Sequence, residues 1–288
     1  MIFLLLAILS SASLPLLFRA FDDWRVNIFW AIPVNYFACI VVGVLFAPAP
    51  HNMSELASQP WFPLGMLQGL VLAVNFYLLA YTAQRAGVSV AALASRLSVA
   101  IPAILAFLLY GDSLSAIKMM GLTAAVLSLY LSTAAGQDFG VTRTWLRRLL
   151  PILVFLMFGC HFALLKFTQA RYLDSSSYHL YVTISFLFAF LASVVVGVAK
   201  ILTVKIAVRA GDLIAGGVLG MINYGAIYFL VKVLSLEGWQ SSQLFPMYSV
   251  GVVSVSSLFA MILFKEHLSK WKTLGLVVGL LAVALLNQ

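Results

Sequence analysis

The sequence is poor in charged residues and in cysteine. Only 9% of its 288 residues are Asp, Glu, Lys or Arg, whereas 63% are hydrophobic. Soluble domains carry roughly 25% charged residues, so this composition excludes an ordinary soluble protein. The two cysteines, Cys39 and Cys160, lie inside apolar runs. They are predicted to be small buried hydrophobic residues rather than a disulfide or a metal site.

Catalytic and nucleotide-binding signatures are absent as well. The sequence has no H-E-x-x-H motif, no G-x-S-x-G turn, no paired intramembrane aspartates and no G-x-x-x-x-G-K loop. We therefore predict no enzyme activity, no catalytic residue, no metal and no cofactor. Transport would then use a gradient or passive exchange instead of ATP. The net charge of +8 is explained by basic residues in loops, which fix membrane topology, so no nucleic-acid partner is predicted.

Long apolar runs fill most of the chain. A helix needs about 20 apolar residues to cross a bilayer, and the runs lack the alternation of membrane β-strands. They predict an all-α integral membrane protein with ten transmembrane helices. The expected spans are residues 2–20, 27–47, 61–83, 88–110, 115–134, 149–170, 176–199, 211–233, 240–263 and 268–287.

A polar turn followed by an apolar helix occurs twice, at a constant offset of 154 residues. Asp112 aligns with Glu266, Ser115 with Ser269, and Gly121 with Gly275, in addition to matching Leu and Lys positions. This predicts a first five-helix repeat at 1–134, a connecting loop at 135–148 and a second repeat at 149–288. Because each repeat has an odd number of spans, the second enters the membrane from the opposite side, and the repeats are inverted.

Basic residues near span ends predict the orientation. The odd-numbered loops hold twelve of them and the even-numbered loops hold three. Positive loops stay in the cytoplasm. The sequence therefore predicts a multi-pass protein of the plasma (cytoplasmic) membrane, with both termini outside the cytoplasm.

The charged residues inside the predicted spans are basic. All nine carboxylates lie in loops or at span ends, which argues against carboxylate-based proton coupling and against a carboxylate cage for cations. Arg96 lies well inside its span, and Lys166 lies near the end of another. Arg96 must face protein, water or ligand, as either a structural tie or a ligand contact, and a ligand there would offer an oxygen anion. Lys166 either binds ligand or extends its amine to the membrane surface.

Neutral polar residues gather on the third, fourth, sixth, eighth and ninth spans. Asn75 and Asn223 are equivalent in the two halves, so both are predicted to face one central cavity. The predicted substrate-binding residues are Arg96, Asn75, Tyr77, Tyr81, Ser95, His161, Lys166, Asn223, Tyr224, Tyr228, Tyr248 and Ser249. An interhelical hydrogen bond or an interfacial aromatic role explains any one of them equally well. His161 is also a candidate for titration near neutral pH.

Two acids and two prolines are candidates for gates and hinges. Asp112 and Glu266 close the fourth and ninth spans, where they either pair with lysines across the next turn or gate opposite membrane faces. Pro102 and Pro246 interrupt the same spans, as either packed kinks or hinges.

The repeated turn resembles that of the drug/metabolite transporter superfamily, EamA-like family. The matching stretches are GDSLSAIKMMG at Gly111–Gly121 and KEHLSKWKTLG at Lys265–Gly275, and the resemblance covers nearly the whole chain. Asp112 stands where the family usually has glutamate. The resemblance implies ten spans and an exporter of amino acids or other metabolites, with spans 1, 3, 4, 6, 8 and 9 lining the path. Its motifs specify architecture and say little about the substrate.

Together these features predict a secondary-active transporter, an exporter of a small zwitterionic or anionic metabolite such as an amino acid. It would work by alternating access around a central cavity. The alternative is a transporter of organic cations or drugs through an aromatic cage of Tyr and Trp. A membrane-embedded enzyme or assembly factor would need a catalytic constellation that the sequence lacks. The expected partners are a small-molecule solute and the lipid bilayer, with the chain a monomer or a homodimer.

Overall fold

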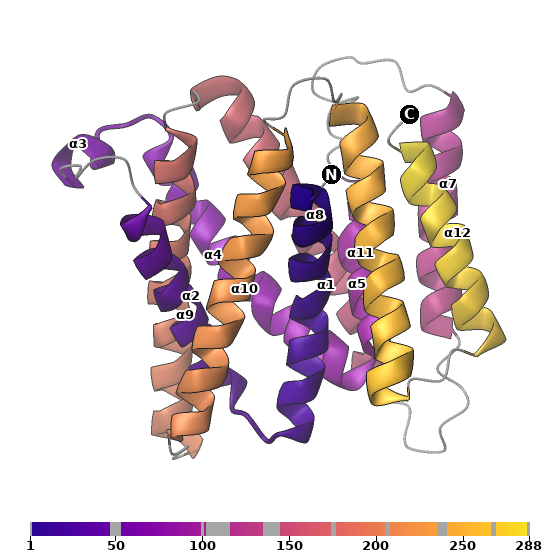
Figure 1. Ribbon diagram of the computed structural model, residues 1–288, viewed down its shortest axis with the longest axis horizontal. Coiled ribbons are helices and arrows are strands. Elements are labelled where there is room, and N and C mark those ends of the chain that lie inside the picture. The colour runs from indigo at the N-terminus through magenta and orange to yellow at the C-terminus, as the bar shows by residue number, and fades with distance from the viewer. Residues whose placement is uncertain are drawn as a thin grey trace. The chain divides into compact units, whose positions relative to one another are not determined.

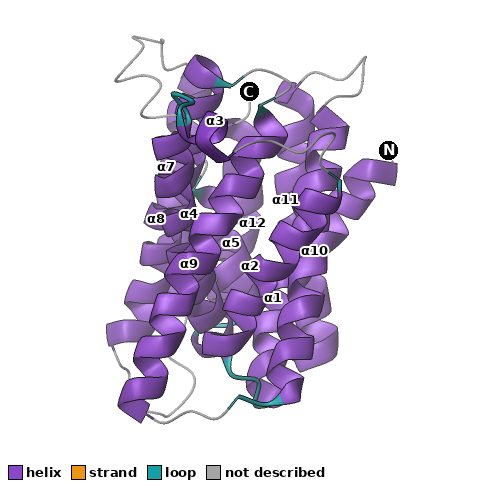
Figure 2. Ribbon diagram, turned by 90° about the vertical axis from the view of Figure 1, so that its left-hand side faces the viewer, coloured by secondary structure: helices purple, strands orange, loops and turns teal. Residues whose placement is uncertain are grey.

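The regular elements of the protein are α-helices. The structure, a computed structural model, describes residues 2–46, 53–98, 101, 116–134, 145–173, 177–204, 208–234, 241–265 and 269–286. Within these ranges there is no strand (Figures 1 and 2). The helices are α1 (Ile2–Asp23), α2 (Ile28–Leu45), α3 (Met53–Ala57), α4 (Phe62–Arg85), α5 (Val88–Leu97), α7 (Ala116–Ala134), α8 (Trp145–Tyr172), α9 (Tyr178–Val204), α10 (Ala210–Leu234), α11 (Ser241–Phe264) and α12 (Lys270–Leu286). The all-helical prediction is confirmed for these residues.

Each of the ten predicted spans contains a helix, and α3 is an additional short one. By length and composition, α1, α2, α4 and the segments His179–Ala199 and Ala210–Leu230 are able to cross a membrane. Shorter apolar helices lie at Val88–Leu97, Met119–Ser128, Leu149–Leu165, Tyr248–Phe264 and Thr273–Leu285. A total of ten crossings, and the inverted relation of the two halves, stay predictions.

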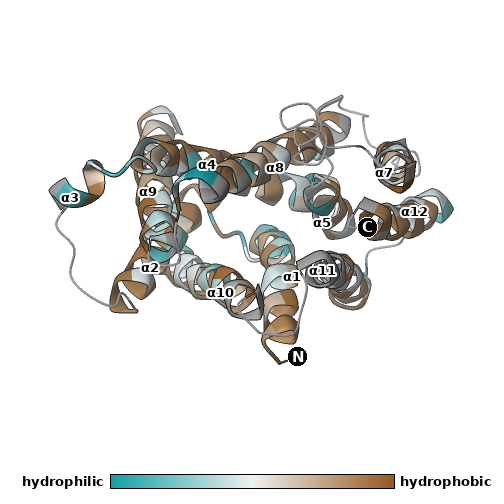
Figure 3. Cartoon of the chain, turned by 90° about the horizontal axis from the view of Figure 1, so that it is seen from above, coloured by the Kyte–Doolittle hydropathy of each residue, from teal (hydrophilic) through white to brown (hydrophobic). Residues whose placement is uncertain are grey.

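The helices expose many large apolar side chains. Apolar colouring prevails along them, with hydrophilic stretches on α3 and α4 among others (Figure 3). Examples more than half exposed are Val44, Leu45, Val195, Leu202, Ile214, Met221, Ile262 and Leu263. Water would penalise such surfaces and hydrocarbon would not. The chain is therefore a multi-pass membrane protein.

The chain packs into two compact units, each built from separated segments. Unit 1 consists of Met1–Ala20, Leu78–Cys160 and Gly225–Gln288. Unit 2 consists of Phe21–Tyr77 and His161–Tyr224. Both units draw on both halves of the sequence. The boundaries of the two predicted repeats are not tested by this division and stay a prediction.

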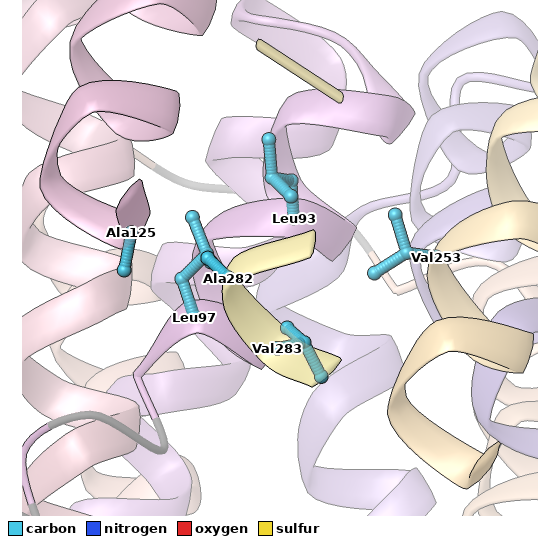
Figure 4. Packing of buried hydrophobic residues seen from close by; sticks show 6 residues of the cluster. All are labelled: Leu93, Leu97, Ala125, Val253, Ala282 and Val283. Atoms are coloured by element: carbon cyan, nitrogen blue, oxygen red, sulfur yellow. The ribbon is translucent and has the colours of Figure 1, made fainter. Parts of the chain in front are cut away.

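Unit 1 has an apolar core around α5. Leu93 and Leu97 of α5 pack with Ala125 of α7, Val253 of α11, and Ala282 and Val283 of α12 (Figure 4). Helix α12 also packs along α7, where the hydroxyl of Ser128 donates to the carbonyl oxygen of Gly275 at 2.6 Å. A second apolar cluster joins α1 to α11 through residues that include Leu4, Tyr248 and Val252. Helix α5 is thus held by its neighbours in the unit.

Unit 2 is built on close helix contacts made by glycine. In α10, a Cβ added at Gly216 would lie 2.6 Å from the carbonyl oxygen of Ala31, and one at Gly220 would lie 2.5 Å from that of Asn35. In α9, a Cβ at Gly197 would lie 2.9 Å from the carbonyl oxygen of Phe29. Small residues let helix backbones approach in this way in membranes. Helix α2 therefore packs tightly against both α9 and α10 and continues through Pro33.

A buried carboxylate joins the first turns of α2 and α10. Asp212 is 2% exposed. Its two oxygens accept hydrogen bonds from the backbone N–H groups of Asn27 at 2.8 Å and Arg209 at 3.0 Å. Negative charge is favourable at a helix N-terminus, because the first N–H groups have no partner within the helix. Asp212 thus fixes the register of the glycine-packed helix pair.

Candidate functional site

Helix α5 of unit 1 is a buried helix that carries one ionised side chain, Arg96. The chain turns from α4 into α5 at Gly87, whose φ of 107° is strained for other residues. The N–H groups of Ala86 and Gly87 both donate to the carbonyl oxygen of Thr82, which closes the turn tightly. All residues of α5 are buried except Arg96. A helix buried on every side is normally apolar, so an arginine there needs an explanation.

The guanidinium of Arg96 lies against the ring of Tyr248. Its Cζ is 4.7 Å from the ring centroid, within the range of a cation–π interaction. Tyr248 is 6% exposed, and its hydroxyl shares a hydrogen bond of 2.5 Å with the hydroxyl of Ser11. Three helices therefore meet at this point: α5 supplies the charge, α11 supplies the ring, and α1 supplies the hydroxyl that fixes the ring.

Arg96 is not neutralised within the part of unit 1 that the structure describes. Its buried Nε has no hydrogen-bond partner there. The described residues of unit 1 include no aspartate or glutamate, since all four described carboxylates, Asp22, Asp23, Glu55 and Asp212, belong to unit 2. The Tyr248 ring lies against the guanidinium without offering a hydrogen-bond acceptor to Nε. The planar N–H edge of a guanidinium matches the two oxygens of a carboxylate.

Three amides, a thiol and an imidazole form side-chain hydrogen bonds between helices of unit 2. Asn223 donates from Nδ2 to Oδ1 of Asn35 at 3.2 Å and to Sγ of Cys39 at 3.6 Å. Cys39 in turn donates to the carbonyl oxygen of Gly220 at 3.4 Å. Gln68 and His161 are joined by a hydrogen bond between Nε2 and Nδ1. These contacts tie α2 to α10 and α4 to α8.

Asn75 is buried without a hydrogen bond from its side chain. It is 1% exposed, and neither its Oδ1 nor its Nδ2 has a partner among the described residues. Asn223 is 4% exposed. Both asparagines are therefore buried in the protein. A common cavity for the two stays a prediction.

The predicted binding residues divide between the two units. Unit 1 holds Arg96, Tyr81, Ser95, Tyr228, Tyr248 and Ser249, and unit 2 holds Asn75, Tyr77, His161, Asn223 and Tyr224. Within unit 1 the structure brings Arg96 and Tyr248 into contact. Ser95 donates to the carbonyl oxygen of Ala92 at 2.8 Å, which is a local bond within its helix.

The predicted tyrosines differ in environment. Tyr77 donates to the carbonyl oxygen of Ser193 at 3.4 Å and packs on Phe29, so a structural role accounts for it. Tyr224 is buried and stacks on Phe46. Tyr228 is 39% exposed, the most exposed of the predicted aromatic residues. A binding role for any of these tyrosines stays a prediction.

Several predicted residues lie outside the part that the structure describes. They are Asp112, Glu266 and Pro102, together with the side chains of Lys166 and Pro246. Their roles as gates, hinges or ligand contacts stay predictions.

Ser11, Asn35 and Gln68 belong to the polar contacts, and sequence reasoning did not select them. Gln68 precedes Asn75 by seven residues, which places both on one face of α4. That spacing is a local signal that would have identified Gln68. Ser11 and Asn35 bond to residues about 190 to 240 positions away in the sequence, so no local pattern indicates them.

Comparison with known proteins finds a family match in the first part of the chain. Residues 1–134 match the sequence model of the EamA-like transporter family, which is part of the drug/metabolite transporter superfamily. The resemblance of the sequence to this family is thereby confirmed for residues 1–134, and the match indicates a membrane transporter of the drug/metabolite type.

Two further similarities extend over nearly the whole chain. An uncharacterized protein of Haemophilus influenzae is 25% identical over 292 residues, which cover 97% of this chain and 95% of the relative. A solved crystal structure aligns with a TM-score of 0.58 at 16% identity, over 99% of this chain and 94% of that one. The structural match shows that the two chains share a fold over nearly their whole length.

Proposed function

We propose that the protein is a secondary-active transporter, an exporter, of a small zwitterionic or anionic metabolite, and that Arg96 binds the negative group of this solute. The observation that carries the proposal is the guanidinium of Arg96, which lies on the Tyr248 ring with a buried, unpartnered Nε. The EamA-like match supports transport as the activity. The repeated turn supports alternating access by two related halves.

The cation–π contact with Tyr248 accounts for the position of Arg96. An ion at the centre of a membrane helix costs about 3 kcal/mol, and a buried cation–π contact returns about 2 kcal/mol. The Tyr248 ring therefore keeps Arg96 in place without neutralising it. A solute carboxylate would supply the missing charge together with two parallel hydrogen bonds.

The test is solute flux in proteoliposomes. We expect Arg96→Leu to weaken the transport of labelled carboxylate solutes about 30-fold, since a hydrogen-bonded charge contact contributes about 2 kcal/mol and each 1.4 kcal/mol is tenfold. Arg96→Lys should keep part of the activity, because the charge remains and the planar edge is lost. The matched control is Arg85→Leu, which removes an exposed charge of the same unit. Equal flux in wild type and Arg96→Leu would remove Arg96 from the solute site.

Export of organic cations through an aromatic cage has less support. The buried ring of Tyr248 already holds a cation, and Arg96 would repel a second one. Arg96-independent uptake of choline into the same vesicles would favour this alternative.

A further inference from the structure

The charged residues in the described part of unit 1 restrict the solute further. We propose that the solute bound at Arg96 is an organic monocarboxylate without an ammonium group, such as a 2-oxo acid or a 2-hydroxy acid, and that α-amino acids are poor substrates. The proposal rests on the proposed function, because it assumes that Arg96 holds the carboxylate. The proposed function allows zwitterionic and anionic metabolites, and this proposal selects the anionic ones.

The charges near Arg96 distinguish the two classes of solute. The described residues of unit 1 contain no carboxylate, and no carboxylate lies in the interior of any predicted span. A monocarboxylate brings the charge at Arg96 to zero. An α-amino acid brings a carboxylate and an ammonium together, so a net charge of +1 remains. An uncompensated charge in a low-dielectric interior is costly.

The ammonium of a bound α-amino acid would lie close to Arg96. In an α-amino acid the amine is attached to the carbon that carries the carboxylate. A carboxylate bound to the guanidinium edge therefore places the ammonium within several ångströms of Arg96, where two like charges repel. A keto or hydroxyl oxygen at the same carbon carries no charge, and it extends the set of acceptors toward the arginine N–H groups.

The hydroxyl groups of α5 and α11 are neutral hydrogen-bonding groups. The hydroxyl of Ser98 donates to the carbonyl oxygen of Ser95 at 2.5 Å, and that of Tyr248 is bonded to Ser11. Ser89 is 5% exposed, lies two turns before Arg96 on the same face of α5, and has no partner for its hydroxyl among the described residues. This free hydroxyl donates readily to a solute oxygen. It also accepts from an amine, but it brings no charge to offset an ammonium.

The ring of Tyr248 also disfavours a second cation. The face of an aromatic ring, such as that of tyrosine, is a neutral group that stabilises an ammonium. In unit 1 the ring of Tyr248 lies against Arg96 itself, with Cζ 4.7 Å from the ring centroid. Its favourable electrostatic field is therefore already used by the arginine. The same ring that keeps Arg96 in place thus makes the site a poor one for a second cation.

The experiment compares pairs of acids that differ only at the second carbon. Wild-type protein in liposomes is preloaded with labelled 4-methyl-2-oxopentanoate or leucine, and with phenylpyruvate or phenylalanine. Efflux is measured at pH 7.5, with protein-free liposomes giving the leak. We expect each oxo acid to leave at least about tenfold faster than its amino acid, a difference of about 1.4 kcal/mol. N-acetyl-leucine, which has the leucine side chain and no ammonium, should compete with the oxo acid, whereas leucine should not.

The variants separate this proposal from the proposed function. Oxo-acid efflux should fall about 30-fold in Arg96→Leu and be kept in Arg85→Leu, with size-exclusion and thermal unfolding confirming that both variants are folded. Leucine efflux that equals or exceeds that of its oxo acid, and that depends on Arg96, would overturn the monocarboxylate proposal and leave the proposed function in place. Efflux that is unchanged in Arg96→Leu, or the absence of carboxylate efflux from folded wild-type protein, would overturn both.

Discussion

Adding a single methyl group at Gly220 should destabilise unit 2, whereas the same change three residues earlier in α10 should not. A Cβ at Gly220 would lie 2.5 Å from the carbonyl oxygen of Asn35 and 2.7 Å from the Cβ of Ala38. Both atoms belong to α2 near its backbone and cannot rotate away. At Gly217 nothing lies within 4 Å of the added methyl group.

The two variants differ in the clash and share the other effects. Alanine is a better helix former than glycine by about 1 kcal/mol, and both Gly220→Ala and Gly217→Ala gain this amount. Overpacking of a well-packed core costs about 1–3 kcal/mol. The free energy of unfolding of Gly220→Ala should therefore be about 1–3 kcal/mol lower than that of Gly217→Ala. The separation of α2 and α10 would also weaken the hydrogen bond from Asn223 to Asn35.

The assay is unfolding in detergent followed by tryptophan fluorescence. For a chain of this size a difference of 1 kcal/mol corresponds to about 2–4 °C in Tm, so Gly220→Ala should melt several degrees below Gly217→Ala. Equal melting temperatures for the two variants would show that α2 and α10 are not in backbone contact at this level. The account of unit 2 as a glycine-packed bundle would then be wrong.

Substitutions at three further positions test other contacts. Tyr248→Phe should lower the free energy of unfolding by about 1 kcal/mol, the value of one hydrogen bond, and leave solute affinity nearly unchanged, because the ring stays on Arg96; Tyr248→Leu should also weaken solute binding in the flux assay. Asp212→Asn should cost about 1–3 kcal/mol in thermal unfolding, because a buried charge-assisted acceptor of two N–H groups is lost. Asn223→Leu should cost about 1–3 kcal/mol in the same measurement, because Asn35 loses its described side-chain partner.

Each of these predictions has a matched control. Asp23 is exposed, and Asp23→Asn should change the free energy of unfolding by less than about 0.5 kcal/mol. Met221 is 64% exposed, two residues before Asn223, and Met221→Leu should also be neutral within that limit. A loss of stability in a control as large as in its test variant would show that the buried hydrogen bonds are not the cause. Solute affinity that falls equally in Tyr248→Phe and Tyr248→Leu would contradict the stacking role of the ring.

The positions of the helices could be predicted from the sequence because a bilayer imposes one strong rule. A run of about 20 apolar residues must satisfy its backbone hydrogen bonds internally, so each long run becomes a helix. The helices found at Ile2–Asp23 and Phe62–Arg85 agree with spans predicted from the runs alone. The approximate ends also follow, because polar residues such as Asp23 and Arg85 mark them.

The grouping of helices into units could not be predicted in the same way. The rule that makes apolar helices gives no information on which helix packs against which, since lipid tails are as apolar as leucine. The contacts that decide the grouping are close backbone approaches, such as Gly216 against Ala31 and Gly220 against Asn35. They join segments far apart in the sequence, and glycine is frequent in membrane helices for other reasons too.

The candidate site was partly visible in the sequence. Arg96 could be selected because an arginine inside an apolar run is expensive and must have a reason. Tyr248 was selected as one of many aromatic residues, and only the structure shows that its ring contacts Arg96. Ser11 could not be selected, because a serine in a membrane helix commonly bonds within its own helix. Its bond to Tyr248 depends on how α1 packs against α11.

The central claim is that the unneutralised guanidinium of Arg96 binds the carboxylate of a solute. The most direct measurement is equilibrium binding of labelled 4-methyl-2-oxopentanoate to purified wild-type protein and to Arg96→Leu, with Arg85→Leu as the control. The account predicts saturable binding to wild type and Arg85→Leu, and a Kd about 30-fold weaker in Arg96→Leu, which corresponds to about 2 kcal/mol. Binding of equal strength in all three proteins would contradict it.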